Sequence, residues 1–214
     1  MRENIIKAIE ENKIIAIMRG VEPEKAVKVA RALSKGGIKL VEVTFNQKSK
    51  DGFKDTLNAI QAIKENCPDM IVGAGTVLSI KQVDLAKQAG ATYIVSPDAD
   101  EDVIAYTVKC DMVSLPGAYT ATEAKRAHNA GADFVKLFPC VEGSISYLKA
   151  MKAPLSHIKF LAVGGVNVDN AKAFIDAGAV GIGVGGSLIN KELIEREDWK
   201  GLTQLAKNFV EQVK

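Results

Sequence analysis

A lysine lies in the middle of an apolar strand pattern, FVKLF at 134–138. Side chains alternate between the two faces of a strand, so Lys136 shares its face with Phe134 and Phe138. Desolvation among aromatic rings disfavours the ammonium form and lowers the pKa of the amine, which leaves a neutral nucleophile for a carbonyl carbon. The other interpretations are a lysine on the outer, helix-facing surface or one in a structural ion pair.

A carboxylate interrupts a second apolar strand pattern, KLVEVTF at 39–45. Here Glu42 shares a face with Leu40 and Thr44, and a carboxylate close to a lysine can relay protons. The alternative is that Glu42 only neutralises Lys136. Because a buried Lys–Glu pair adds little stability by itself, the purely structural interpretation is the weaker one.

Two glycine clusters come late in the chain, Gly164-Gly165 and the GVGGS segment at 183–187. Loops after the last two strands of a β/α barrel often bind phosphate through backbone N–H groups, and here Gly186 and Ser187 would contribute. Glycines needed only for tight turns are the alternative. A dinucleotide-binding loop is disfavoured because the segment comes too late and lacks its usual βαβ context.

Three further positions follow other strand patterns. Arg19 ends the first one, where a guanidinium can bind a carboxylate or a phosphate with two hydrogen bonds. Thr76 offers a hydroxyl after the glycines of GAG at 73–75, which we expect to let a ligand approach the backbone. Pro97 follows the fourth pattern, where turn chemistry is an equally good explanation.

Elements that would hold these side chains alternate along the chain. Between short apolar runs lie segments with helical apolar spacing, and four helix-to-strand joints share a weak repeat. Such alternation is also typical of doubly wound sheets, but a count of eight runs favours a single (β/α)₈ TIM barrel of the α/β class over residues 1–214, with an extra amphipathic helix at the N-terminus. The eight expected strands are 14–18, 39–45, 70–75, 92–96, 112–116, 133–138, 158–163 and 180–184.

Composition excludes several classes of protein. The chain of 214 residues is 47% hydrophobic and carries 28 basic against 26 acidic residues, which argues against disorder and against nucleic-acid binding. The chain has no run of 18 apolar residues, so no membrane span is predicted. The N-terminus lacks the apolar segment of a signal peptide. The three cysteines and two histidines have neither disulfide nor metal-site spacing, so we expect a cytoplasmic protein without a metal.

With these residues in order, the chain resembles the 2-keto-3-deoxy-6-phosphogluconate (KDPG) / 4-hydroxy-2-oxoglutarate (KHG) aldolase family. The resemblance runs nearly end to end, and motifs in order on successive strands are far more specific than any one of them. They are VEVTF at 41–45, VGAGTV at 72–77, IVSP at 94–97, LPG at 115–117, FVKLFP at 134–139, VGGVN at 163–167 and GVGGS at 183–187.

The resemblance implies a metal-free class I aldolase on a (β/α)₈ barrel, usually trimeric. Lys136 matches the Schiff-base lysine of the family's F-x-K-x-F-P strand, and Glu42 matches its proton-shuttling glutamate. The positions that match substrate-binding residues are Thr76, Pro97 and Phe138 around the pyruvate group, Gly164, Gly165, Gly186 and Ser187 in the phosphate loops, and Arg19, where some members place a substrate-binding arginine.

Two positions depart from the best-known members of that family. Many carry an arginine four residues after the glutamate, where this chain has Asn46, and many have a threonine where it has Val163. Loss of a hydroxyl removes a hydrogen bond that can sense the stereochemistry at C4 of the substrate. Both changes resemble the branch that acts on the galactonate epimer, so we expect a relaxed or shifted C4 preference.

The function expected from the sequence is retro-aldol cleavage of a phosphorylated keto-deoxy sugar acid, KDPG or its galactonate epimer, to pyruvate and D-glyceraldehyde 3-phosphate. Cleavage of 4-hydroxy-2-oxoglutarate to pyruvate and glyoxylate is a second expected activity. Two alternatives remain open at this point, another phosphate-binding barrel enzyme such as an epimerase or synthase, and a non-catalytic sugar-phosphate binder. The first would not need a neutral lysine in the sixth strand, and the second would gain little from the costly pairing of Glu42 with Lys136.

Overall fold

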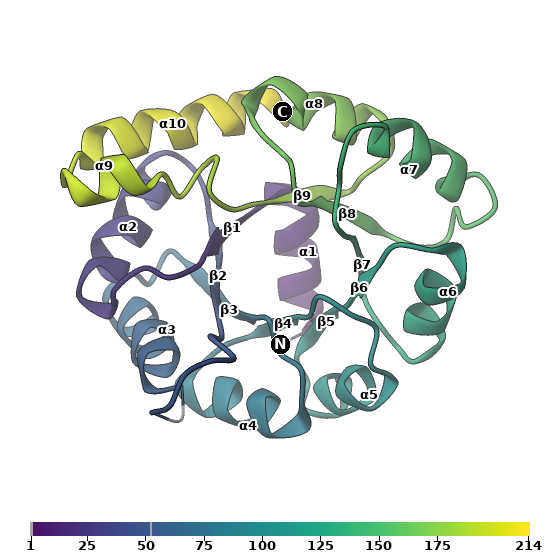
Figure 1. The fold of residues 1–214 in the computed structure, drawn as a ribbon, viewed down its shortest axis with the longest axis horizontal. Coiled ribbons are helices and arrows are strands. Elements are labelled where there is room, and N and C mark those ends of the chain that lie inside the picture. Colours follow the sequence, from purple (N-terminus) through teal and green to yellow (C-terminus); the bar gives the residue numbers. More distant parts are fainter. Residues whose placement is uncertain (1, 52) are drawn as a thin grey trace.

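The computed structural model describes residues 2–51 and 53–214 and shows a ring of parallel strands surrounded by helices (Figure 1). The strands pair in the order β5-β4-β3-β2-β1-β9-β8-β7-β6. Their bounds are β1 Ile14–Met18, β2 Leu40–Thr44, β3 Ile71–Gly75, β4 Tyr93–Val95, β5 Val113–Leu115, β6 Gly117–Ala118, β7 Val135–Leu137, β8 Phe160–Val163 and β9 Gly181–Val184. The α/β barrel expected from the sequence is confirmed.

Helices follow the strands in alternation and form the outer layer of the barrel (Figure 1). Their bounds are α1 Arg2–Asn12, α2 Pro23–Lys35, α3 Lys54–Asn66, α4 Ile80–Ala89, α5 Glu101–Lys109, α6 Ala121–Asn129, α7 Ser144–Lys152, α8 Val168–Asp176, α9 Lys191–Glu195 and α10 Trp199–Gln212. No helix in the described part of the chain is long and apolar enough to cross a membrane.

The sequence pattern at 112–116 contains the short strand β5, and a second short strand, β6, follows directly after it. Pro116 separates them because it has no N–H to donate to a strand ladder. Its carbonyl still accepts a hydrogen bond from the Lys136 N–H (2.8 Å), and the Ala118 carbonyl accepts one from Phe138 (3.1 Å). Thus β5 pairs with β4, and β6 pairs with β7. Together the two short strands take the place of one of the eight strands of the barrel.

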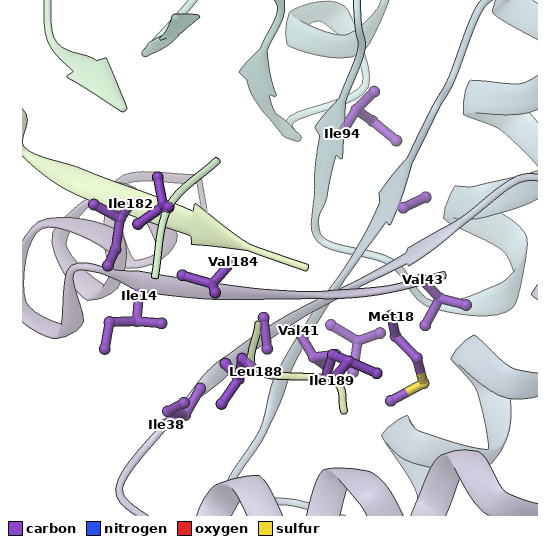
Figure 2. Packing of buried hydrophobic residues seen from close by; sticks show 14 of the residues in the cluster. Ile14, Met18, Ile38, Val41, Val43, Ile94, Ile182, Val184, Leu188 and Ile189 are labelled. Carbon is purple, nitrogen blue, oxygen red and sulfur yellow. The ribbon is translucent and has the colours of Figure 1, made fainter. Parts of the chain in front are cut away.

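Alternation along each strand divides the buried side chains into two clusters. Outward-facing residues, such as Ile14 and Met18 of β1, pack against the helices, as Figure 2 shows around β1, β2 and β9. Inward-facing residues fill the barrel, and they form a separate cluster that includes Ile15, Leu40 and Phe134. In this register Glu42 lies beside Ile17 of β1 and Gly73 of β3, on the inward face.

The N-terminal helix α1 closes one end of the barrel. Its Ile9 is fully buried and belongs to the inward cluster, with Ile5 and Ile6 packed against the same cluster. Figure 1 shows α1 crossing the middle of the ring. The opposite end, where the strands finish, therefore remains the place for a site, as in other β/α barrels.

Local capping signals fix the starts of several helices on that end. Pro23 occupies the first turn of α2, and the Ser79 side chain accepts a hydrogen bond from the Gln82 N–H at the start of α4. Asn167 forms a capping box with Asn170 at the start of α8. Each cap satisfies N–H groups that a helix start leaves unpaired, so the preceding loops end at defined residues.

Candidate active site

Lys136 lies in the centre of β7 and points into the barrel, with 6% of the residue exposed. Its Nζ is 4.4 Å from the centroid of the Phe138 ring. Burial lowers the pKa of this amine from its ordinary value of 10.5, and the nearby positive charge of Arg19 lowers it further, while Glu42 opposes the shift. The site therefore favours the neutral, nucleophilic form of the amine.

Glu42 lies on β2 with 3% of the residue exposed, and its carboxylate rests against Gly75 of β3. A Cβ atom at position 75 would collide with Glu42 Oε1, so the glycine is required for this close approach. Burial raises the pKa of Glu42 above 4.5, and the positive charges of Lys136 and Arg19 limit the rise. A raised pKa makes the carboxylate a stronger base, which suits a group that accepts a proton and then returns it.

Arg19 brings the third charge and is held at the mouth of the barrel by Thr76. Its Nη2 donates a hydrogen bond to Thr76 Oγ1 (3.2 Å). Thr76 has a positive φ of 56°, a conformation that β-branched residues rarely adopt. Gln47 Nε2 donates to the Thr76 carbonyl (2.7 Å) and accepts at Oε1 from Gln82 Nε2 (3.1 Å), which stabilises this backbone conformation.

One cavity of about 220 Å³ brings most of the predicted residues together. It lies at the carboxyl ends of the strands, and the side chains of Glu42 and Lys136 both line it. The predicted residues that line it are Arg19, Glu42, Lys136, Phe138, Gly164, Gly165, Gly186 and Ser187. A larger cavity of about 560 Å³ adjoins it and shares Ile17, Arg19 and Gly186, so Arg19 lies between the two spaces.

The glycine loops offer unpaired donors to this cavity. Gly164 and Gly165 have φ values of 91° and 64°, and a Cβ at Gly165 would approach the Cys140 carbonyl oxygen to 2.6 Å. Within the described residues, the N–H groups of Gly165, Gly186 and Ser187 have no backbone acceptor. Unpaired N–H groups in loops that line a cavity can bind an anion without any charged side chain.

Two predicted residues lie outside the cavity lining as the described residues define it. Thr76 is connected to the cavity only through its hydrogen bond to Arg19. Pro97 is half-buried, and its carbonyl packs so closely on Gly117 that no Cβ fits there. The expectation that Gly73 and Gly75 open the backbone to a ligand is wrong, because the Tyr93 ring and the Glu42 carboxylate occupy that space.

Asn46, one of the two unusual positions, turns away from the cavity. Its Oδ1 accepts a hydrogen bond from the Lys48 N–H (3.1 Å), a local turn that needs no tertiary partner. Val163, the other, lies in the cavity wall and is 6% exposed. Of these two departures, Val163 is the one that alters the surface of the cavity.

Sequence reasoning missed several residues that complete the site. Ile17 and Val166 line the cavity, and the inward alternation of β1 could have identified Ile17. Gln47 and Gln82 support Thr76, but their sequence positions, 35 residues apart, carry no signal of this contact. Among the described residues, no three His, Cys, Asp or Glu side chains gather where they could hold a metal ion.

A comparison with protein families decides between the aldolase and the two alternative functions that the sequence left open. Residues 5–205 match the family model described as KDPG and KHG aldolase. The chain belongs to this aldolase family. An epimerase, a synthase or a non-catalytic binder is accordingly not favoured, and the cavity with its lysine and glutamate is the candidate active site of an aldolase, a carbon–carbon lyase.

Individual relatives agree over most of the chain. The chain is 32% identical to the 2-dehydro-3-deoxy-phosphogluconate aldolase of Treponema pallidum over 97% of this chain and 96% of the relative. It is 39% identical to the 2-dehydro-3-deoxy-6-phosphogalactonate aldolase of Escherichia coli over 82% and 83% of the two chains. A KDPG aldolase structure from Legionella pneumophila, with pyruvate captured as a covalent carbinolamine, superposes with a TM-score of 0.84 at 26% identity, covering 94% and 96%.

Proposed function

We propose that this protein is a class I aldolase that cleaves a 2-keto-3-deoxy-6-phospho sugar acid to pyruvate and D-glyceraldehyde 3-phosphate. The observation that carries the proposal is the burial of Lys136 beside Glu42 in a cavity at the carboxyl ends of the strands. Burial favours the neutral amine that imine formation requires. The whole of residues 1–214 is proposed to act as one barrel domain.

In the first half of the reaction, neutral Lys136 Nζ attacks the C2 carbonyl carbon and forms a carbinolamine. Loss of water gives a protonated imine, whose positive charge attracts electrons from the neighbouring C3–C4 bond. Arg19 contributes a fixed positive charge close to both catalytic groups, which favours the neutral amine and the ionised carboxylate. Phe138 lies against Nζ and limits access of water.

In the second half, Glu42 accepts the proton of the C4 hydroxyl as the C3–C4 bond breaks. The bonding electrons move into the imine to form an enamine, and the aldehyde leaves. Glu42 then returns a proton to C3 of the enamine, and water hydrolyses the resulting imine to release pyruvate and free Lys136. Each proton that Glu42 takes is given back within one turnover, so the glutamate is unchanged at the end.

The glycine loops are proposed to bind the terminal phosphate. The unpaired N–H groups of Gly165, Gly186 and Ser187 support this role, with Gly164 giving the chain its turn. Phosphate binding far from C2 holds the reacting carbons in position against Lys136 and Glu42. Thr76 and Pro97 are proposed, with Phe138, to surround the pyruvate portion, Thr76 acting together with Arg19.

The galactonate epimer is proposed as a substrate beside the gluconate epimer. Val163 supports this, because an apolar wall discriminates less against a hydroxyl configuration than a hydrogen-bonding wall does. The 39% identity with the E. coli phosphogalactonate aldolase points the same way. The family description also includes KHG, so cleavage of 4-hydroxy-2-oxoglutarate to pyruvate and glyoxylate is proposed as a second activity.

A homotrimer in the cytoplasm is proposed for the assembled enzyme. The resemblance implies the trimer, and the exposed apolar side chains Leu78 and Ile80, beside the mouth of the barrel, offer a surface for another subunit. Light scattering coupled to size-exclusion chromatography measures the mass directly. A monomeric mass would contradict the trimer without affecting the proposed chemistry.

The deciding experiment is intact mass spectrometry after incubation with pyruvate and borohydride, which reduces an imine to a stable amine. We expect one pyruvyl adduct on the wild type and none on Lys136→Ala. Lys159→Ala is the matched control, because Lys159 also lies near a phenylalanine of this sheet but is paired with Glu10 (2.7 Å) and is half-exposed. Absence of the adduct from the wild type would overturn the lysine mechanism.

A further inference from the structure

Tyr93 of β4 carries a hydroxyl group whose position the reaction above does not explain. The residue is fully buried inside the barrel, in the same apolar cluster as Leu40, Val113 and Phe134. In the described part of the chain, its Oη is the one buried side-chain polar atom without a hydrogen-bond partner. Phenylalanine would fill the same volume without desolvating a hydroxyl, so the hydroxyl requires a reason.

The surroundings of Tyr93 place its ring and the Glu42 carboxylate against the same strand, β3. The Tyr93 ring rests on Gly73, and the Glu42 carboxylate rests on Gly75. These two glycines lie on the same inward face of β3, two residues and therefore about 7 Å apart. Since neither glycine has a side chain, β3 places nothing between the end of the phenol and the carboxylate above it.

The titratable groups that face Glu42 come from three elements, and two of these groups are charged. Lys136 approaches from β7, Arg19 from the end of β1, and Tyr93 from β4 as a neutral group. Burial raises the pKa of Tyr93 well above 10, and the negative charge of Glu42 raises it further. The phenol therefore keeps its proton at neutral pH and can act only as a donor toward an ionised carboxylate.

We propose that Tyr93 is a positioning residue for Glu42, and that its hydroxyl donates a hydrogen bond to the carboxylate through one buried water molecule. Tyr93 Oη has no direct hydrogen-bond partner among the described residues, so its link to the carboxylate requires a bridging water, which accepts from the phenol and donates to the carboxylate. The bond stabilises the ionised form of Glu42 and holds its side chain in one orientation. The role of Glu42 rests on the proposed function, whereas the contact itself does not.

The test is Tyr93→Phe, which removes the hydroxyl and keeps the ring. Loss of a donor to the ionised form raises the pKa of Glu42, and we expect a rise of about one pH unit. The primary measurement is difference infrared spectroscopy of the protonated carboxyl C=O stretch as a function of pH. Glu42→Gln identifies the band, because it removes that carboxyl group alone.

The pH profile of kcat/KM gives an independent measurement in the active enzyme. The acidic limb should move to higher pH by the same amount in Tyr93→Phe, so that activity falls about tenfold on the acidic side and little on the plateau. Tyr106→Phe is the matched control. It removes a hydroxyl that donates to Asp84 (2.8 Å) on the outer helices, and it should leave both measurements unchanged.

An unchanged or lowered pKa of Glu42 in Tyr93→Phe, with the variant folded by its unfolding transition, would overturn the inference. The hydroxyl would then be a buried group without a role, and its removal should raise the stability of the fold. Failure of the proposed function appears differently, as absence of the pyruvate adduct and of aldolase activity in the wild type. The infrared titration decides the role of Tyr93 in either case.

Discussion

The two buried regions of this barrel differ sharply although the same strands build both. The layer between the sheet and the helices, which contains Ile14, Met18 and Val41, consists of apolar side chains in close contact (Figure 2). The barrel interior contains an apolar cluster as well, but it also holds Glu42 and Lys136. Alternation along each strand thus gives one face to stability and the other to chemistry.

This difference shows how the barrel accommodates two buried charges. Burial shifts the pKa of Glu42 upward and that of Lys136 downward, so the interior works against both ionised forms. Such a pair contributes little to the stability of the fold, but the fold is strongly destabilised when one partner is removed. The continuous apolar layer outside the sheet compensates for this cost. Variants on the two faces should therefore separate activity from stability.

The largest effect is expected from Lys136→Met, which removes the proposed nucleophile from the inner face. Imine formation becomes impossible, so kcat/KM should fall by at least about a thousandfold. Steady-state kinetics with coupled detection of pyruvate measures this loss. A variant that keeps a tenth of the wild-type activity would show that another group reacts with the substrate.

Glu42→Gln should lower kcat by about 10²- to 10⁴-fold while the pyruvate adduct still forms, because the amide cannot accept the C4 proton. Its stability should also depend on pH. A carboxyl whose pKa rises above 4.5 on folding stabilises the fold below pH 4.5, and this contribution is lost as pH rises through the folded value. Urea unfolding from pH 4 to 8 should thus show the wild type losing stability relative to Glu42→Gln as the pH rises, in addition to a constant cost of removing one partner of the buried pair.

On the outer face, Leu33→Ala should have the opposite signature. Leu33 of α2 is fully buried in the outer layer, and the cavity left by its truncation should reduce the free energy of unfolding by about 2–5 kcal/mol. The kcat/KM of the folded enzyme should change by less than about twofold, because no catalytic group contacts this layer. A large loss of activity in fully folded protein would contradict the separation of the two faces.

The smallest effect is expected from Val163→Thr, which keeps the shape of the inner wall and adds one hydroxyl. The ratio of kcat/KM for the gluconate and galactonate epimers should shift by about tenfold toward the gluconate epimer. Parallel assays with both epimers give this ratio directly. If the wild type cleaves only the gluconate epimer, the proposed relaxed preference is wrong.

Much of the architecture could be predicted from local patterns. Each of the eight expected apolar runs contains strand residues, and the amphipathic N-terminus forms α1. The strand neighbours showed which side chains share a face with Glu42 and Lys136, and the structure placed that face inside the barrel. The site was less predictable at Thr76 and Pro97, which do not line the cavity within the described residues, and at Gly73 and Gly75, where side chains occupy the space expected for a ligand.

The sequence by itself determined which residues share a strand face and where strands and helices begin, because both depend on neighbours within a few positions. Only the tertiary structure decided which inward residues meet. The register of β2, β3 and β4 sets the height of each residue in the barrel: it aligns Glu42 with Gly73, so that the Glu42 carboxylate reaches Gly75 while the Tyr93 ring rests on Gly73. Register depends on pairing between distant segments, so no local pattern could reveal that the Tyr93 ring and the carboxylate proposed as catalytic rest on the same strand.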